Sequence, residues 1–339
     1  MNGRPRQGWR LRSRLQSTAI ITTMVLALVG IGGTSQAKAP GLIGRIAFAR
    51  QATPAISDQG HVVYTINPDG SQMHVLADPA DSPRWSPDGT EIAIGDADCM
   101  FDGRCAAVIF DVDAGGSRVL PNGRLDLFLF CNVWSPNGAM LACGGVSDTN
   151  PSLSGVYTIR SSDGGGLTKV LSCDECGLTD YSPDGRRLLI GIGGKLFSVK
   201  LNGSGLRQIT PDGSLVDIDG GASWSPSGGQ ILFGANADTD HRRSIFAVNA
   251  DGTNLHQVPI PGCGGAFSDS RSIACFAPDW SPDGTKFVFS RASASSTSLS
   301  VTNIYAVNAD GSGLFQVTHQ ASGLEVTTAD WGTHPLMSR

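Results

Sequence analysis

Three aspartates stand at equivalent positions in a repeated motif and are the first candidates for chemistry. Asp180, Asp279 and Asp330 each come directly before a tryptophan or tyrosine. Carboxylates that converge in a confined site create a negative potential that attracts cations. Two interpretations are open: these side chains bind a cation or a cationic ligand, or they accept hydrogen bonds from backbone amides where structural units meet. The second interpretation is favoured.

Eight cysteines in a chain of 339 residues form the second group. Their number and spacing are typical of a disulfide-bonded protein from an oxidising compartment. We expect four local disulfides, although spacing alone does not determine connectivity: Cys99–Cys105, Cys131–Cys143, Cys173–Cys176 and Cys263–Cys275. The second pair is the clearest, because it flanks a predicted turn almost symmetrically. The third pair also fits a redox pair or half of a zinc site, but the chain has no second Cys-x-x-Cys.

Motifs for catalysis are sparse. The sequence has no Gly-x-Ser-x-Gly elbow of the serine hydrolases. No glycine-rich phosphate loop leads into a predicted helix. Six histidines also lack any metal-binding spacing: His61, His74, His241, His256, His319 and His334. We therefore predict no metal and no cofactor, and we favour a non-catalytic protein while leaving enzyme activity open.

A repeat with a period near 50 residues supplies the elements that position these residues. The motif Trp-Ser-Pro-Asp-Gly or a close variant begins at six positions: Trp85, Trp134, Tyr181, Trp224, Trp280 and, truncated, Trp331. A second repeat ends in Asp-Gly, as at Asn249–Gly252 and Asn308–Gly311. Glycine after Asp or Asn supplies the positive φ of a tight turn. Such a period predicts a repeat architecture.

Each unit reads as four short strands. In the second unit these are Pro83–Ser86, Glu91–Ile94, Ala106–Val112 and Ser117–Leu120. The predicted fold is all-β: a six-bladed β-propeller of four-stranded antiparallel blades. Arg45–Phe48, His61–Ile66 and Met73–Leu76 supply three strands of one blade, and the segment ending at Trp331 supplies its fourth. The ring is thus closed by N- and C-terminal strands sharing one blade, with the six aromatics packed between blades.

The paired motifs at Trp280–Phe289 and Asn308–Thr318 resemble the blades of TolB-like propellers. The resemblance covers about Gly44 to Trp331. TolB is a periplasmic protein of a cell-envelope complex, with an α/β domain ahead of its propeller. The few residues between Ala37 and Gly44 leave no room for that domain, so its partner contacts are not carried over. The resemblance implies an envelope protein whose propeller binds a protein or peptide.

Residues 1–37 have the layout of a secretory signal peptide. Five arginines precede an apolar run, and Ser35-Gln36-Ala37 fits a cleavage site; an uncleaved N-terminal anchor is the alternative. We assign 38–43 to a linker, 44–333 to the propeller and 334–339 to a tail. No other segment is apolar enough to span a membrane. Loss of the five arginines takes the formal net charge from −5 to −10, which argues against a nucleic-acid partner.

The predicted function is that of an exported, monomeric binding or scaffold protein, periplasmic, associated with the cell wall or secreted. Its partner would be a protein or peptide of the cell envelope. The alternative is a secreted enzyme acting on carbohydrate or a small metabolite, of the lyase, glycosidase or quinone-dependent dehydrogenase type. Antiparallel strands place the repeated turns on one face and the variable connections, with the cysteines, on the other. Binding is expected on those variable loops or at the channel mouth, near Asp180, Asp279 and Asp330.

Overall fold

Six four-stranded sheets make up the computed structural model of this chain. The structure describes residues 43–51, 61–95, 105–124, 126–174, 176–213, 216–236, 243–264, 273–295, 298–320 and 325–337. All of them belong to the unit Ser35–Arg339. The predicted signal peptide and residues 38–42 of the predicted linker lie outside the described residues. Within these residues no helix is long and apolar enough to cross a bilayer.

The blades are numbered here in chain order, and their strands run from the innermost to the outermost. Blade 1 contains β24 (Val326–Trp331), β1 (Ile46–Gln51), β2 (His61–Ile66) and β3 (His74–Ala77). Blade 2 contains β4 (Asp81–Trp85), β5 (Glu91–Gly95), β6 (Cys105–Asp111) and β7 (Ser117–Pro121). Blade 3 contains β8 (Phe128–Trp134), β9 (Met140–Val146), β10 (Gly155–Arg160) and β11 (Thr168–Ser172).

The second half repeats the pattern. Blade 4 contains β12 (Gly177–Tyr181), β13 (Arg187–Ile192), β14 (Lys195–Lys200) and β15 (Arg207–Gln208). Blade 5 contains β16 (Val216–Trp224), β17 (Gln230–Asn236), β18 (Arg243–Asn249) and β19 (His256–Gln257). Blade 6 contains β20 (Ile273–Trp280), β21 (Lys286–Ser295), β22 (Ser298–Asn308) and β23 (Phe315–Gln316). A 3-10 turn, η1 (Pro151–Leu153), lies in the connection between β9 and β10 of blade 3.

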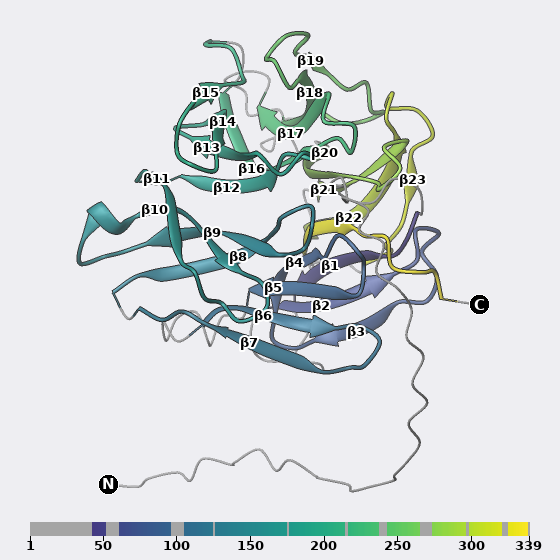
Figure 1. Ribbon diagram of the computed structural model, residues 1–339. Helices are drawn as coiled ribbons and strands as arrows, with labels where there is room; N and C mark the ends of the chain where they lie inside the picture. The colour runs from purple at the N-terminus through teal and green to yellow at the C-terminus, as the bar shows by residue number, and fades with distance from the viewer. Residues whose placement is uncertain are drawn as a thin grey trace, which may run out of the picture. The chain divides into compact units, whose positions relative to one another are not determined.

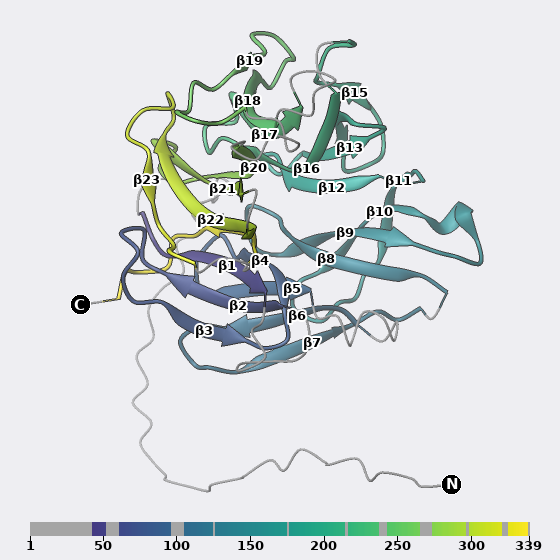
Figure 2. The same cartoon turned by 180° about the vertical axis from the view of Figure 1, so that it is seen from behind.

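The ring closes as predicted. Each blade contacts the next, and blade 6 contacts blade 1 through β24. Strand β24 pairs antiparallel with β1, with Trp331 opposite Ile46. The purple and yellow ends of the described chain meet in both views (Figures 1 and 2). The six-bladed, four-stranded antiparallel propeller is therefore confirmed, together with the blade shared by the two ends of the chain.

The conserved geometry of the repeat lies in its first turn, which joins strands one and two of a blade. In blade 2, Ser86 Oγ donates to Asp88 Oδ1 at 2.6 Å and accepts from the N–H of Glu91 at 2.9 Å. The N–H of Gly89 donates to the carbonyl of Ser86, and Gly89 has φ 75°. A positive φ costs little only for a residue without Cβ. The turn chemistry thus explains the Ser-x-Asp-Gly spacing.

Six apolar clusters form the core, one at each blade interface. Every cluster contains one of the six repeated aromatic residues. Trp85, for example, lies among Ala47 and Val63 of blade 1 and Ile92 of its own blade. All six aromatics are at most 8 % exposed. Since a buried Trp or Tyr contributes a large apolar area, these residues join the blades, as predicted.

Disulfides connect three of the four expected pairs. Cys131 lies directly opposite Cys143 in the β8–β9 ladder, with Cα atoms 4.0 Å apart, and the two are bonded. Cys173–Cys176 and Cys263–Cys275 are bonded as well. Cys105 is disulfide-bonded, and its expected partner Cys99 lies outside the described residues.

The sequence alone suggests a variable connection at Arg291–Ser300, between the second and third strands of blade 6. The structure corrects this, because β21 and β22 continue there as a long hairpin in which Ser295 pairs with Ser298. Small residues alternate with apolar ones there, and such a segment extends a ladder as readily as it forms a loop.

Candidate functional site

A small pocket lies where the innermost strands of the blades end. Its volume is about 60 Å³, and its walls combine aromatic residues, turn prolines and four charged side chains. The lining residues come from the last two positions of an innermost strand and from the proline of the following turn, so the pocket opens on the face that carries the repeated turns, called the turn face below. The charged residues are Arg84, Asp180, Asp279 and Asp330.

Each of the three aspartates accepts a hydrogen bond from the next blade. Asp330 Oδ2 accepts from the N–H of Trp85 at 2.7 Å, and Asp279 Oδ2 accepts from the N–H of Trp331 at 2.8 Å. Asp180 Oδ2 accepts from the N–H of Trp224 at 2.7 Å. Each carboxylate thus satisfies a backbone donor across a blade junction, which stabilises the ring because a buried donor left without an acceptor is costly.

A serine holds the same position at a fourth junction. Ser223 Oγ accepts from the N–H of Trp280 at 3.4 Å and donates to Asp279 Oδ1 at 2.8 Å. Asp279 therefore takes part in hydrogen bonds with both blade 5 and blade 1. At these four junctions the residue before the aromatic acts as a latch between blades, which for the three aspartates is the interpretation that the sequence favours.

Arg84 brings the carboxylates together electrostatically. Its Nη1 lies 3.3 Å from Asp330 Oδ1 and 3.8 Å from Asp279 Oδ1. Burial alone would lower the pKa of the Arg84 guanidinium, but the charges of Asp330, Asp279 and Asp180 raise it above its usual value. The guanidinium stays charged, and three carboxylates face one cation around the pocket.

Turn prolines form the rim. A Cβ added to Gly185 would lie 3.6 Å from Cδ of Pro136, and one added to Gly284 would lie 3.6 Å from Cδ of Pro226. Each turn therefore packs its proline on the glycine of the following blade. Blade 1 lacks this turn, and Gly89 lies instead against the backbone and side chain of residues 333 and 334. There His334 stacks on Trp85, with ring centroids 5.3 Å apart.

No protein-family model and no curated protein matches the chain. Solved structures do match. TolB from Acinetobacter baumannii aligns with a TM-score of 0.66 at 19 % identity over 87 % of this chain and 68 % of that one. Putative TolB from Agrobacterium tumefaciens gives 0.60 at 18 % identity over 86 % and 92 %. The chain folds as a TolB-like propeller.

The TolB-like propeller also overlays on proteins with other roles. A chain of a nidogen–laminin complex aligns with a TM-score of 0.60 at 9 % identity, over 86 % of this chain and all of that one. An oligogalacturonate lyase in complex with manganese aligns at 0.54 and 11 % identity, over 84 % and 77 %. At these identities the matches show the fold alone. Among the described residues of this TolB-like propeller, no three His, Cys, Asp or Glu side chains are grouped to hold a metal ion.

The structure places the three predicted aspartates around one pocket of the TolB-like propeller and adds Arg84 to them. Arg84 occupies the same motif position, directly before Trp85, and that position was the available signal. The pocket also opens on the turn face, and not on the face where the sequence predicts the variable loops. The prolines and aromatics of the repeat therefore line the site as well as building the scaffold.

Proposed function

We propose that this chain is an exported, non-catalytic binding protein of the cell envelope. It holds a protein or peptide partner at the turn face, with a cationic side chain of that partner entering the pocket. The observation that carries the proposal is the charge of the pocket: three carboxylates and one guanidinium surround about 60 Å³. That volume suits one side chain, and the excess of negative charge favours lysine, arginine or an amino terminus.

The surroundings support a binding role. Trp134 and Tyr181, with the rim prolines, give the pocket apolar walls, and pockets of mixed apolar and charged lining are typical binding sites. The fold is shared with two TolB structures and with a chain of a nidogen–laminin complex, which is an assembly of proteins. The disulfides agree with an oxidising compartment outside the cytoplasm.

The carbohydrate-enzyme alternative has less support. The likeness to the oligogalacturonate lyase extends to the fold, and the pocket carboxylates serve as latches between blades. A side chain that holds the backbone of a neighbouring blade is poorly placed to transfer protons during catalysis, because a proton on it would weaken the junction.

The test compares Asp180→Asn with Asp148→Asn. Both changes remove one negative charge without changing size. Asp180 lines the pocket, whereas Asp148 is exposed on the connection between β9 and β10, on the opposite face. The amide oxygen of the first variant can still accept from the N–H of Trp224, while its amino group replaces the oxygen that accepts from the N–H of Tyr181 in the wild type. Purified wild type and variants are used to capture partners from envelope extract, and the captured proteins are quantified.

We expect the Asp180→Asn variant to lose its principal partner by about tenfold, as for a removed charged hydrogen bond. The Asp148→Asn variant should retain it. Thermal unfolding checks that both variants remain folded. Equal capture by all three proteins would exclude the turn-face pocket as the binding site.

A further inference from the structure

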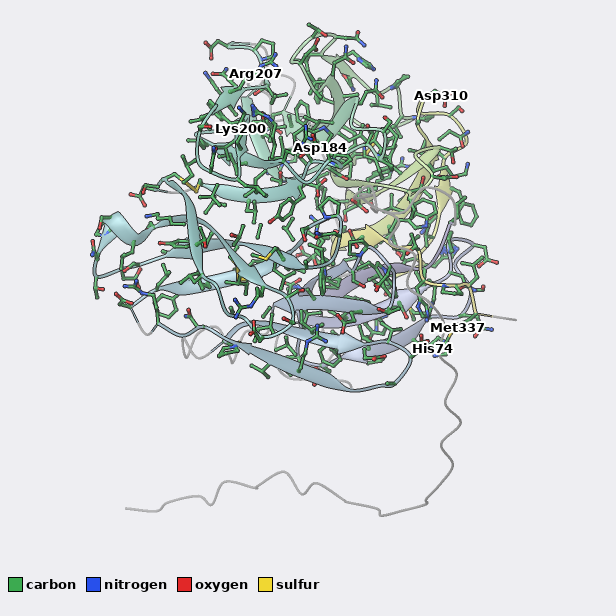
Figure 3. The ribbon with its side chains drawn as sticks, viewed as in Figure 1. His74, Asp184, Lys200, Arg207, Asp310 and Met337 are labelled. Carbon is green, nitrogen blue, oxygen red and sulfur yellow. A yellow bond between two sulfur atoms is a disulfide. The ribbon has the colours of Figure 1, made fainter. Side chains whose placement is uncertain are left out.

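Blade 4 carries a concentration of positive charge that neither the ring nor the pocket requires. The segment from Arg186 to Arg207 contains five basic residues and no acidic one, in a chain with a net charge of −5. Figure 3 shows Lys200, Arg207 and the nearby Asp184 in the same part of the molecule. A cationic surface on an acidic protein points to a specific anionic partner.

Strand register brings two of these cations together. Arg187 of β13 lies directly opposite Lys200 of β14. Both side chains reach the same spot, since a Cβ added to Gly205 would lie 3.5 Å from Arg187 Nη2 and 3.5 Å from Lys200 Cε. Residues directly opposite in an antiparallel pair have close side chains, and like charges there are destabilising.

Four other blades do not place two cations opposite each other at the same register. The equivalent cross-strand pairs in blades 2, 3, 5 and 6 are Glu91–Asp111, Met140–Arg160, Gln230–Asn249 and Lys286–Asn308. In blade 2 the acidic pair is balanced by Arg118 of β7, which donates to both oxygens of Glu91. Arg207 of β15 stands at the position of Arg118. Blade 4 therefore has a cation at all three places.

A groove lies beside this pair. It has a volume of about 610 Å³ and is lined by residues of the two turns of blade 4, including Arg186, Arg187 and Lys200. Its one carboxylate, Asp184, accepts from Ser182 Oγ at 2.7 Å and from the N–H of Arg186 at 3.1 Å. Three cations thus face one carboxylate that already has two donors.

Hydrogen bonds to backbone carbonyls orient the guanidinium groups of Arg187 and Arg207. Arg187 donates to the carbonyl of Gly205 from Nη1 at 3.1 Å and from Nη2 at 3.2 Å. Arg207 donates to the carbonyl of Asp251 in blade 5. The contacts of Arg187 are with a neutral oxygen, so they orient its guanidinium without neutralising it. The pKa of the Asp251 carboxyl, in contrast, is lowered by hydrogen bonds from Thr253 and also by the charge of Arg207.

We propose that the groove of blade 4 binds a phosphate group through Arg187, Lys200 and Arg186. A guanidinium supplies paired donors that match tetrahedral oxyanions, and an ammonium adds a compact charge. A bound phosphate would neutralise the repulsion between the opposed cations. The group has two possible sources, free inorganic phosphate or the headgroup of an anionic lipid, which the experiment separates.

The test measures unfolding midpoints in phosphate and in chloride at equal ionic strength. The double variant Arg187→Gln with Lys200→Gln is compared with Arg160→Gln with Lys169→Gln, which removes the same charge from blade 3. Phosphate should stabilise the wild type and the blade 3 control. In the blade 4 variant the apparent dissociation constant should rise at least about tenfold. An unchanged phosphate effect in that variant overturns the proposal.

A single variant separates binding from structure. Lys200→Gln removes the like-charge pair and leaves the bonds of Arg187 in place. In chloride at low ionic strength it should unfold at a higher temperature than the wild type, yet gain less from phosphate. A variant that is less stable in chloride and responds fully to phosphate would contradict the site.

Sedimentation with vesicles identifies the source. Wild-type protein is mixed with vesicles of phosphatidylcholine alone or with added phosphatidylglycerol. Binding to the anionic vesicles that free phosphate displaces supports the headgroup, and a phosphate response without vesicle binding supports a soluble phosphate. The proposal is refuted if the wild type shows no phosphate response and does not bind the anionic vesicles.

Discussion

Deletion of residues 325–339 is expected to remove most of the stability of the propeller. Strand β24 is the innermost strand of blade 1, and it contains Trp331, which is 1 % exposed. The indole of Trp331 donates to the carbonyl of Gly44 at 3.0 Å. Loss of a buried Trp side chain alone costs about 3–5 kcal/mol, and the buried Val326 adds about 1.5–3 kcal/mol. Total stabilities are only about 5–15 kcal/mol.

Urea unfolding followed by circular dichroism measures the effect. Trp331→Ala is the companion variant, with an expected loss of about 3–5 kcal/mol. Leu336→Ala is the matched control, because that side chain lies five residues further on and is 53 % exposed. An unfolding midpoint of the truncated chain equal to that of the wild type would refute closure by β24.

Three further predictions concern the scaffold. Gly332→Ala should destabilise by about 1–3 kcal/mol, because its Cβ would lie 2.4 Å from Cγ of Trp85; urea midpoints measure this, and an unchanged value contradicts the close approach. Cys131→Ala with Cys143→Ala should lose about 2–4 kcal/mol under oxidising conditions, and the difference in stability between this variant and the wild type should disappear when both are reduced. Burial by itself would raise the pKa of Asp283. The hydrogen bonds that its carboxylate accepts from Ser281 and Thr285 outweigh this effect, so the pKa lies below its usual value. Its stabilising effect is therefore complete above the unfolded pKa of about 3.9 and is lost as pH falls through the lower folded pKa. Asp283→Asn should flatten the pH dependence of stability below about pH 4, and an unchanged acid profile would count against this account.

The scaffold was predictable because each copy of the repeat contains the residues that determine its turn and its packing. A serine, an aspartate or asparagine and a glycine at fixed spacing specify one turn, and an aromatic residue before them specifies one packing position. Five complete copies and one truncated copy then determine the number of blades and the place where the ring closes. Even Cys131 and Cys143 follow from symmetry about such a turn.

The electrostatics were not predictable in the same way. Arg84 and Asp330 are 246 residues apart and meet only because the ring closes. Periodicity places both residues before an aromatic residue, but it does not determine how close their charged groups lie in the folded ring. The pair of Arg187 and Lys200 likewise depends on register, and a shift by one residue would place the two charges on opposite faces of the sheet.

Closure by β24 also imposes an order of events on a chain made from its amino terminus. Strand β1 has its inner partner almost the whole length of the chain away, with Ile46 opposite Trp331. Blades 2 to 5 can complete their sheets while later segments are still being made, but β1 keeps one unpaired edge until β24 emerges. An unpaired edge is a template for aggregation, and distant pairings form slowly. The propeller is therefore most open to aggregation just before β24 emerges, and this single short strand then completes the first blade.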